Sequence, residues 1–334
     1  MKVNCPLCAN DAILKCDKWQ GYQEPTVFSI YHCTNCNTAF SMPRCDTTEL
    51  YNLIYDNSSF LPGYCDYLDL SKEIKQQKNP LRYLVSKSLT YWSVVYALKN
   101  TICINTGSIL EVGCGYGYLT YALNKAGYNI KGLDLSESAV SQAKKSFGDY
   151  YLCGDLFEYA KLHPESVDVV ILTEVIEHIE KPAGFLEALS KMIKPGGSII
   201  LTTPNKSFYP VDVIWSGENP PVHCWWFSED SIKYIADSLN LSTRFLDYSN
   251  SYQVSMSHYN QKQVIYPSRL DIEGKPIPQK WEGYYQGGLF PAKFKKSVFY
   301  QSFSQILYPM IAKIFYPSHK RTTALCAILS KKKN

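Results

Sequence analysis

The pattern of apolar and polar positions changes near residue 106 of this 334-residue chain. From Ser108 onward, short apolar runs such as "SILEV", "VDVVILT" and "GGSIILTTP" alternate with amphipathic stretches. This alternation is typical of a parallel sheet that carries helices on both faces. We therefore predict an α/β core over residues 106–250.

Three other segments flank this core. Residues 46–105 are aromatic and show helical periodicity, most clearly in "LRYLVSKSLTYWSVVYALKN", which predicts a helical connector or lid. Residues 1–45 are rich in cysteine. Residues 251–334 combine aromatic and aliphatic clusters with lysines, which predicts a helical, basic and aromatic C-terminal extension.

The composition is that of an ordinary globular protein, with 46% apolar and 19% charged residues. The N-terminus lacks an apolar run of signal-peptide length, and no stretch reaches the ~18 apolar residues of a spanning helix. A cytoplasmic protein is therefore expected, and its 12 cysteines favour metal binding or buried thiols over disulfides. The 27 tyrosines suit surfaces that bind rings, sugars or membrane interfaces.

Four of the cysteines form two C-x2-C pairs, Cys5 with Cys8 and Cys33 with Cys36, separated by 24 residues. Two such pairs can close a tetrahedral thiolate site while the intervening chain forms the strands of a ribbon. Because protein fills all four positions, we predict a structural zinc. Four unrelated buried cysteines are the alternative. Further soft ligands that could replace a member of the set are Cys16, His32 and Cys45.

A glycine-rich turn follows the first strand of the predicted core. Glu111, Gly113, Gly115 and Gly117 form the pattern E-x-G-x-G-x-G between a strand and a helix. Glycines in such a turn permit positive φ and let the backbone approach a ligand closely. The next predicted strand ends at Asp134, where a carboxylate can bind both hydroxyls of a ribose.

A third predicted strand ends at Asp155, in a position to meet an adenine amino group. A nicotinamide dehydrogenase is the structural competitor. Its fingerprint is usually G-x-G-x-x-G, however, whereas the spacing here is G-x-G-x-G and no separate substrate domain follows. The motifs therefore predict another nucleoside-containing ligand.

These motifs, in this order from about residue 105 to residue 250, resemble the class I S-adenosylmethionine-dependent methyltransferases, and among them the branch of the ubiquinone-biosynthesis O-methyltransferases. The resemblance implies a Rossmann-like sheet and S-adenosylmethionine as cofactor. It implies that the glycine motif with Glu111 cradles the methionine part, that Asp134 binds ribose, and that Asp155 with Leu156 frames the adenine. Leu135 and Thr173 complete the implied cofactor-binding residues.

Three ionisable side chains come directly after the fourth predicted strand, in "TEVIEHIEKPAGF". Glu174, Glu177 and His178 stand at i, i+3 and i+4, so a helix would present them on one face. They also follow the carboxyl end of a strand, where open α/β sheets bind substrates. A further histidine, His223, precedes aromatic residues and a predicted helix start at Ser228. We therefore predict that the four groups converge.

The pattern E-x-x-E-H with a later histidine resembles the metal site of small-RNA 2′-O-methyltransferases, and the ubiquinone O-methyltransferases share its E-x-x-E-H part. The resemblance implies that Glu174, Glu177, His178 and His223 bind Mg²⁺, Mn²⁺, Fe²⁺ or Zn²⁺. Such an ion would lower the pKa of an acceptor hydroxyl. In a second interpretation His178 or His223 is a general base and no metal is bound. In a third, these residues only cap and pack a helix.

Charge is unevenly distributed along the chain. Residues 283–334 contain nine basic and no acidic residues, and because the whole chain carries +4, residues 1–282 carry −5. A basic tail on an acidic body suggests an anionic partner for the tail. Two interpretations follow: the tail docks on an anionic membrane surface, or its aromatic residues pack on the core or in a dimer.

The order of a zinc ribbon and this core resembles bacterial methyltransferases of sugar and surface-polysaccharide pathways. O-methylation of a sugar, glycan or lipid-linked small molecule is therefore the leading hypothesis. Deoxysugar C-methyltransferases share both modules but continue into a large third domain, for which too little chain remains. RNA ribose 2′-O-methylation is disfavoured because the acidic body would repel a phosphate backbone. A zinc-ribbon binding protein with an inactive core would not need the intact motifs.

Overall fold

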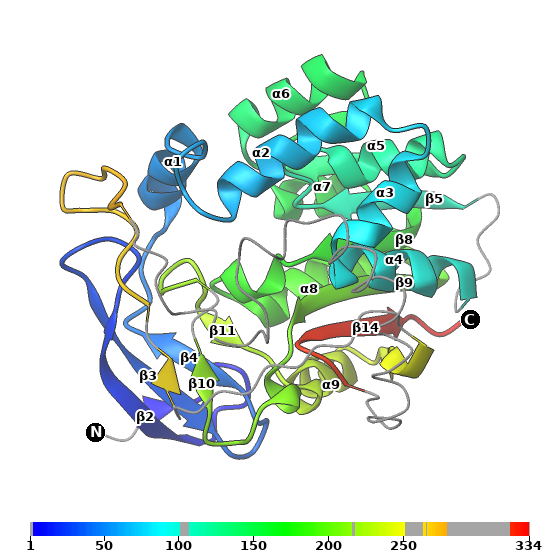
Figure 1. Cartoon of the computed structure of the whole chain (residues 1–334). Coiled ribbons are helices and arrows are strands. Elements are labelled where there is room, and N and C mark those ends of the chain that lie inside the picture. Colours follow the sequence, from blue (N-terminus) through cyan, green and yellow to red (C-terminus); the bar gives the residue numbers. More distant parts are fainter. Residues whose placement is uncertain are drawn as a thin grey trace.

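A seven-stranded sheet runs through the centre of the computed structural model, which describes residues 3–100, 107–215, 218–250, 263–264, 266–278 and 321–333 (Figure 1). The strand order is β12-β14-β9-β8-β5-β6-β7. The neighbours among β5 to β9 are parallel, whereas β14 is antiparallel to both β9 and β12. The predicted Rossmann-like α/β fold is confirmed. The strands are β5 (Ser108–Val112), β6 (Asn129–Asp134), β7 (Tyr151–Cys153), β8 (Val167–Thr173), β9 (Ile193–Pro204), β12 (Ser242–Phe245) and β14 (Ala324–Ser330).

Helices cover both faces of this sheet, and each face has its own apolar core. The central strand β8 is buried on both sides, which explains its uninterrupted apolar run. Ser136 and Ser228 cap the helices that follow them. One face carries α3 (Pro80–Lys87), α4 (Leu89–Asn100), α5 (Tyr118–Lys125) and α6 (Glu137–Phe147). The other carries α7 (Leu156–Leu162), α8 (Pro182–Met192) and α9 (Glu229–Ser238).

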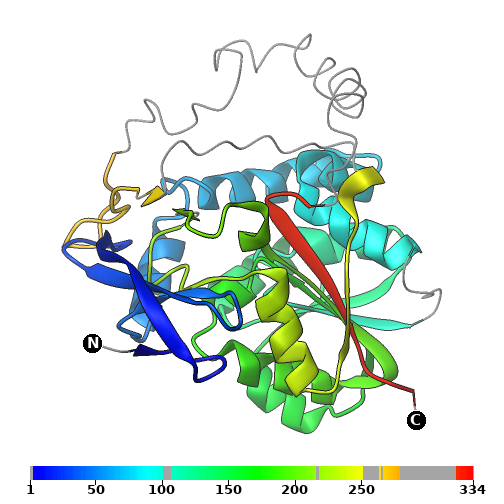
Figure 2. The ribbon, with the colours of Figure 1, turned by 90° about the horizontal axis from the view of Figure 1, so that it is seen from below.

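The cysteine-rich N-terminal segment forms the predicted ribbon, but its sheet does not end at residue 45. Its fifth strand, β11 (Trp225–Trp226), comes from the core half of the chain and pairs Trp225 with Phe40 and Trp226 with Ala39. The ribbon therefore packs beside the core as a joined sheet rather than as a separate unit (Figure 2). The other strands are β1 (Val3–Asn4), β2 (Asp11–Gln20), β3 (Val27–Cys33) and β4 (Ala39–Met42).

Helices α1 (Thr48–Asp56) and α2 (Tyr64–Glu73) and the short η1 (Ile74–Gln76) lead from the ribbon to the core, as the helical pattern predicted. Residues 266–278 lie against both the ribbon and α1, through a bridge between Gln23 and Leu270 and a close approach of Gly274 to Leu53. The remaining elements are the parallel pair β10 (Ile214–Trp215) and β13 (Gln263–Val264), and the 3-10 helices η3 (Lys206–Phe208) and η4 (Tyr248–Asn250).

The C-terminal extension predicted for residues 251–334 is wrong in one respect, because residues 324–330 form β14, an interior strand of the core sheet. Lys331, next to β14, forms an ion pair with Glu165 at 2.9 Å. Most of the basic, aromatic segment for which membrane docking was predicted lies outside the described residues. Within the parts that are described, no helix has the length and apolar character needed to cross a membrane.

Candidate functional site

The glycine motif forms a turn between β5 and α5. Gly113 and Gly117 have φ of 74° and 77°, a region that residues with side chains rarely adopt. A Cβ on Gly113 would stand 2.6 Å from the Val175 side chain, and one on Gly117 would stand 2.4 Å from the Tyr151 ring. A Cβ on Gly115 would meet nothing within 4 Å. Packing thus requires the outer two glycines, and the middle one faces open space where a ligand can approach the backbone.

Two carboxyl groups flank this turn. Asp134, at the end of β6, accepts hydrogen bonds from the N–H groups of Gly115 at 2.7 Å and Ser136 at 2.9 Å. Glu111 is buried in β5 and accepts one from the Thr120 hydroxyl. Burial raises the pKa of Asp134 and raises that of Glu111 to about 8. Each Asp134 oxygen keeps a second lone pair for a further donor, such as a ribose hydroxyl.

The other predicted cofactor residues lie at neighbouring strand ends. Asp155 is exposed and caps α7 by accepting from the N–H groups of Phe157 and Glu158 at 2.8 and 3.0 Å. Leu135 is 73% exposed, and Thr173 is half-buried at the end of β8. The Leu156 side chain packs in the apolar core, so it can offer a ligand only its backbone.

The turn after β8 carries Glu174, Glu177 and His178, but not on one face of a helix as predicted. Glu174 has a φ of 53°, and only the short η2 (Ile176–His178) follows before α8 begins at Pro182. The N–H of Glu174 donates to the Thr202 carbonyl at 3.1 Å, which fixes the turn to β9. A left-handed residue that is not glycine is strained, and such strain is common at functional sites.

Three of the four predicted groups come together at this turn. One ligand atom from each of Glu177, His178 and His223 lies within 4.8 Å of the others, and the two imidazole centroids are 4.6 Å apart. The main chain joins the two segments, because the N–H of Cys224 donates to the Glu177 carbonyl at 2.9 Å. Glu174 is not a member of this close group.

Hydrogen bonds determine which nitrogen of His178 carries a proton. Its Nδ1 lies 2.8 Å from the Val222 carbonyl oxygen and 3.0 Å from the Tyr51 hydroxyl. A carbonyl only accepts, so Nδ1 is protonated and Nε2 keeps its lone pair. Sequence reasoning missed Tyr51, which lies on α1, 127 residues before His178. No local pattern signals a contact over that separation.

The polar groups of this turn are incompletely satisfied. Glu177 Oε2 accepts from the Thr203 hydroxyl at 3.0 Å, whereas Oε1 is buried without a partner, as is Oε1 of Glu174. Burial, with the neighbouring Glu174 carboxyl, raises the pKa of Glu177; burial raises that of Glu174 to about 7. Burial also lowers the pKa of His178 to about 4 and that of His223 well below its ordinary value. A cation or a hydroxyl-bearing ligand would satisfy the orphaned oxygens.

Residues 81–244, which contain the glycine motif, Asp134 and the Glu177–His178–His223 group, match the family described as "Methyltransferase domain". The chain carries a class I S-adenosylmethionine-dependent methyltransferase domain.

Curated relatives of this methyltransferase domain include the ubiquinone biosynthesis O-methyltransferase of Hydrogenovibrio crunogenus, 35% identical over 33% of this chain and 48% of that protein. The enzyme of the same name from Aliivibrio fischeri is 30% identical over 42% of this chain and 58% of its own length. The chain thus spans about half the length of the curated relatives that it matches. Among solved structures, a SAM-dependent methyltransferase from Archaeoglobus fulgidus is 15% identical, covers 79% of this chain and 99% of that one, and has a TM-score of 0.41.

The four predicted cysteines form a second cluster beside the methyltransferase domain. Sγ of Cys5 lies 3.6 Å from that of Cys36, and Sγ of Cys8 lies 3.4 Å from that of Cys33. Metal–sulfur bonds of about 2.3 Å in a tetrahedron give sulfur–sulfur edges of about 3.8 Å, close to these distances. The cluster therefore has the composition and spacing of a closed zinc site.

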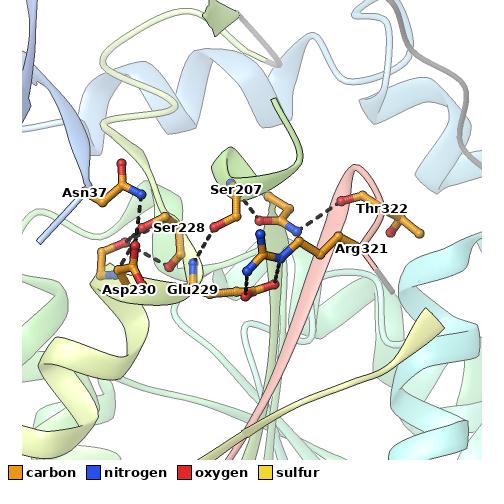
Figure 3. A network of polar contacts seen from close by, with 9 residues as sticks. Asn37, Ser207, Ser228, Glu229, Asp230, Arg321 and Thr322 are labelled. Atoms are coloured by element: carbon orange, nitrogen blue, oxygen red, sulfur yellow. Dashed lines mark hydrogen bonds and ion pairs between the residues drawn. The ribbon is translucent and has the colours of Figure 1, made fainter. Parts of the chain in front are cut away.

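A polar network ties the ribbon, the methyltransferase domain and the start of β14 together at the N-terminus of α9 (Figure 3). Asn37 of the ribbon donates to Asp230 at 3.1 Å, and Arg321 pairs with Glu229 at 2.6 and 2.9 Å. The Glu229 N–H donates to Ser207 at 2.9 Å. The network thus holds the ribbon, the N-terminus of α9 and the residues before β14 in contact.

Proposed function

We propose that the chain is an S-adenosylmethionine-dependent methyltransferase that methylates a hydroxyl oxygen of its acceptor. The observation that carries the proposal is the approach of Glu177, His178 and His223 to within 4.8 Å of one another, beside a turn whose Val175 contacts the glycine motif. Groups that act on a hydroxyl proton belong at this edge of an open α/β sheet. The O-methyltransferase names of the relatives support the same class of reaction.

The glycine turn and its flanking carboxyl groups would hold the cofactor, which supplies an electrophilic methyl group when bound. The open space at Gly115 supports this assignment, and Asp134 retains lone pairs for the ribose hydroxyls. Glu111, which is buried in β5 next to the turn, is also part of the proposed cofactor site. The further members of the proposed set are Gly113, Gly117, Leu135, Asp155, Leu156 and Thr173.

His178 and His223 would act on the acceptor hydroxyl, in one of two ways. In the first, Nε2 of His178 accepts the proton, which its protonated Nδ1 allows. An imidazole whose pKa is about 4 is a weak base, however, so this version relies on the Glu177 carboxyl for assistance.

In the second version Glu177, His178 and His223 would hold Mg²⁺, Mn²⁺, Fe²⁺ or Zn²⁺, which would lower the pKa of a bound hydroxyl. The buried, unpartnered Oε1 of Glu177 supports this version, because a buried carboxylate needs a compensating charge. Nδ1 of His178 donates to a carbonyl, as in metal-binding histidines whose second nitrogen is a ligand. We favour the metal version on these two observations. Glu174 would belong to the same proposed metal site but would lie outside the close group of Glu177, His178 and His223.

Cys5, Cys8, Cys33 and Cys36 would hold a structural zinc. The acceptor that we propose is a sugar, glycan or lipid-linked small molecule, and the cell compartment is the cytoplasm. Attachment to an anionic membrane surface stays a prediction for the basic segment, most of which lies outside the described residues.

Calorimetry with S-adenosylhomocysteine on the full chain tests the cofactor assignment, and we expect one site per chain. Transfer of a labelled methyl group to neutral saccharides, with and without a chelator, tests the reaction and separates its two versions. Loss of transfer on chelation and its recovery on adding one of the four ions support the metal version. A chain that binds no S-adenosylhomocysteine is not the methyltransferase proposed here.

A further inference from the structure

A group of partly exposed side chains lies near the Glu177–His178–His223 group. Tyr67 of α2 keeps 40% of its surface exposed, and Tyr64 and Glu218 are half-buried. Burial raises the pKa of the Tyr67 phenol, and the nearby carboxyl groups of Glu174, Glu218 and Glu177 raise it further. Tyr67 therefore lies close to both Glu218 and the proposed reaction site.

A row of tyrosine rings connects this group of side chains to the glycine turn. Tyr116 of the glycine turn packs edge-to-face on Tyr55 of α1 at 6.3 Å. Tyr55 packs in the same way on Tyr64 at 6.3 Å, and Tyr64 on Tyr67 at 6.0 Å. The row therefore leads from the proposed cofactor site to the lid helix α2. Phenol rings of this kind offer apolar faces together with hydroxyl groups.

Glu218 supplies a carboxyl group close to the N-terminus of α2. Its Oε1 lies 3.7 Å from where a Cβ of Gly63 would stand, at the N-terminus of α2. The Asn219 carbonyl next to it accepts from the N–H groups of Val222 and His223 at 3.0 and 3.4 Å. Glu218 thus sits at one end of the turn that carries His223 at the other.

Several polar atoms of this region lack a partner in the described structure. They have almost no solvent-accessible surface and make no hydrogen bond, which is unfavourable for a buried polar atom. Unpaired acceptor oxygens of this kind favour a ligand that brings hydrogen-bond donors. The atoms are Oε1 of Glu174, Oε1 of Glu177, Oε2 of Glu218 and the hydroxyl of Tyr22.

We propose that Glu218, Tyr64 and Tyr67 form a recognition subsite for the methyl acceptor, and that this acceptor is a neutral, polyhydroxylated ring of the sugar type. The inference rests on the proposed function and names its substrate class. Hydroxyl groups donate to the Glu218 carboxylate, while the C–H faces of the ring pack on the tyrosines. A purely apolar acceptor would leave the orphaned oxygens unpaired, and an anionic group would bring these oxygens no hydrogen-bond donor.

Saturation-transfer NMR on the full chain, saturated with S-adenosylhomocysteine, tests this with neutral methyl glycosides as probes. Hexose phosphates and 4-hydroxybenzoate serve as anionic and aromatic competitors. We expect at least one methyl glycoside to bind, and Glu218→Gln to weaken its binding about tenfold to a hundredfold, the effect of losing a charge-assisted hydrogen bond. Tyr67→Phe should weaken it less than Tyr67→Ala, because the ring face is kept. Glu49→Gln, an exposed change on α1, is the matched control.

Binding of S-adenosylhomocysteine by a variant shows that the variant is folded. The same measurement distinguishes failure of the proposed function from failure of the proposed subsite. If S-adenosylhomocysteine does not bind the wild-type chain, the proposed function is wrong. If it binds but no glycoside does at tens of millimolar, or Glu218→Gln binds glycosides as the wild type does, only the subsite is wrong. Tighter binding of 4-hydroxybenzoate or of hexose phosphates than of any glycoside also overturns it.

Discussion

Asp134 is the residue whose contacts make the sharpest prediction for cofactor binding. It accepts two backbone hydrogen bonds and keeps lone pairs for two ribose hydroxyls. Asp134→Ala should weaken binding of S-adenosylhomocysteine by about 2–4 kcal/mol, at roughly 1–2 kcal/mol per charge-assisted bond. Calorimetry measures the change. Asp149→Ala, at a side chain 89% exposed, is the control. Equal affinities in the two variants would remove Asp134 from the site.

Because Glu111 is buried, we predict that the free energy of unfolding depends on pH. Burial raises its pKa from 4.5 to about 8 in the folded chain, so folding strengthens proton binding. The contribution of protonated Glu111 to the free energy of unfolding is therefore fully present below pH 4.5 and is lost as the pH rises toward 8. In urea unfolding of the ligand-free chain, the wild type should lose up to about 1.4 kcal/mol per pH unit between pH 5 and 8, relative to Glu111→Gln. Parallel curves would mean that Glu111 is ionised in the folded state.

At the level of residues, the sequence predicts what is local. The glycine motif and Asp134 are signalled by their places at strand ends, and the structure brings them together. Tyr51 and Glu218 could not be predicted, because their contacts join segments remote in sequence. Glu177 and His178 were predicted to lie together because of their spacing on a helix face. They do lie together, but the left-handed Glu174 and a short 3-10 helix arrange them.

At the level of elements, the strands predicted for the core sheet are present, whereas β10 to β14 were not predicted, and β11 and β14 show why. β11 has two residues and forms only because β4 offers an edge to it. β14 follows a long basic and aromatic segment, and its run "ALCAILS" does not by itself distinguish a strand from a buried helix. Both strands need partners that are distant in sequence.

The shared β4–β11 ladder makes the ribbon a support for His223. If the four cysteines hold the proposed zinc, Cys33→Ser should release it, because the change removes one of the four thiolate ligands and the folding energy that the metal would supply. We expect faster hydrogen exchange at Ala39–Phe40 and Trp225–Trp226, and S-adenosylhomocysteine binding within about threefold of the wild type, because neither the four cysteines nor the β4–β11 ladder is part of the glycine turn. Metal analysis and exchange mass spectrometry measure both effects.

Cys45→Ser is the control for this change, because Cys45 is exposed and outside the cysteine cluster. Zinc-free protein after purification without chelators would contradict the zinc site itself. Zinc loss without faster exchange at Trp225–Trp226 would contradict only the coupling between ribbon and core.

For the whole molecule, the position of β14 changes how the basic segment can be tested. A chain ending before residue 321 loses an interior strand together with the segment, so its failure to bind liposomes would not identify the membrane contact. Charge reversal of the exposed Lys332 and Lys333 leaves β14 in place. Each of the two large sheets contains a strand from a distant part of the chain: β11 in the ribbon sheet and β14 in the core sheet.

We predict that a chain ending at residue 320 does not fold, because β14 lies between β9 and β12. Its Leu325, Ile328 and Leu329 are at most 2% exposed. Each such side chain contributes roughly 1.5–3 kcal/mol, so their loss alone is comparable to the 5–15 kcal/mol by which a typical domain is stable. The truncation also leaves β9 with an unpaired, apolar edge, which favours aggregation. A chain ending at Lys331 keeps all of β14 and the Lys331–Glu165 pair, and it should unfold cooperatively like the full chain. Circular dichroism melts of the soluble fractions compare the two, and a cooperative melt of the shorter chain would show that β14 is dispensable.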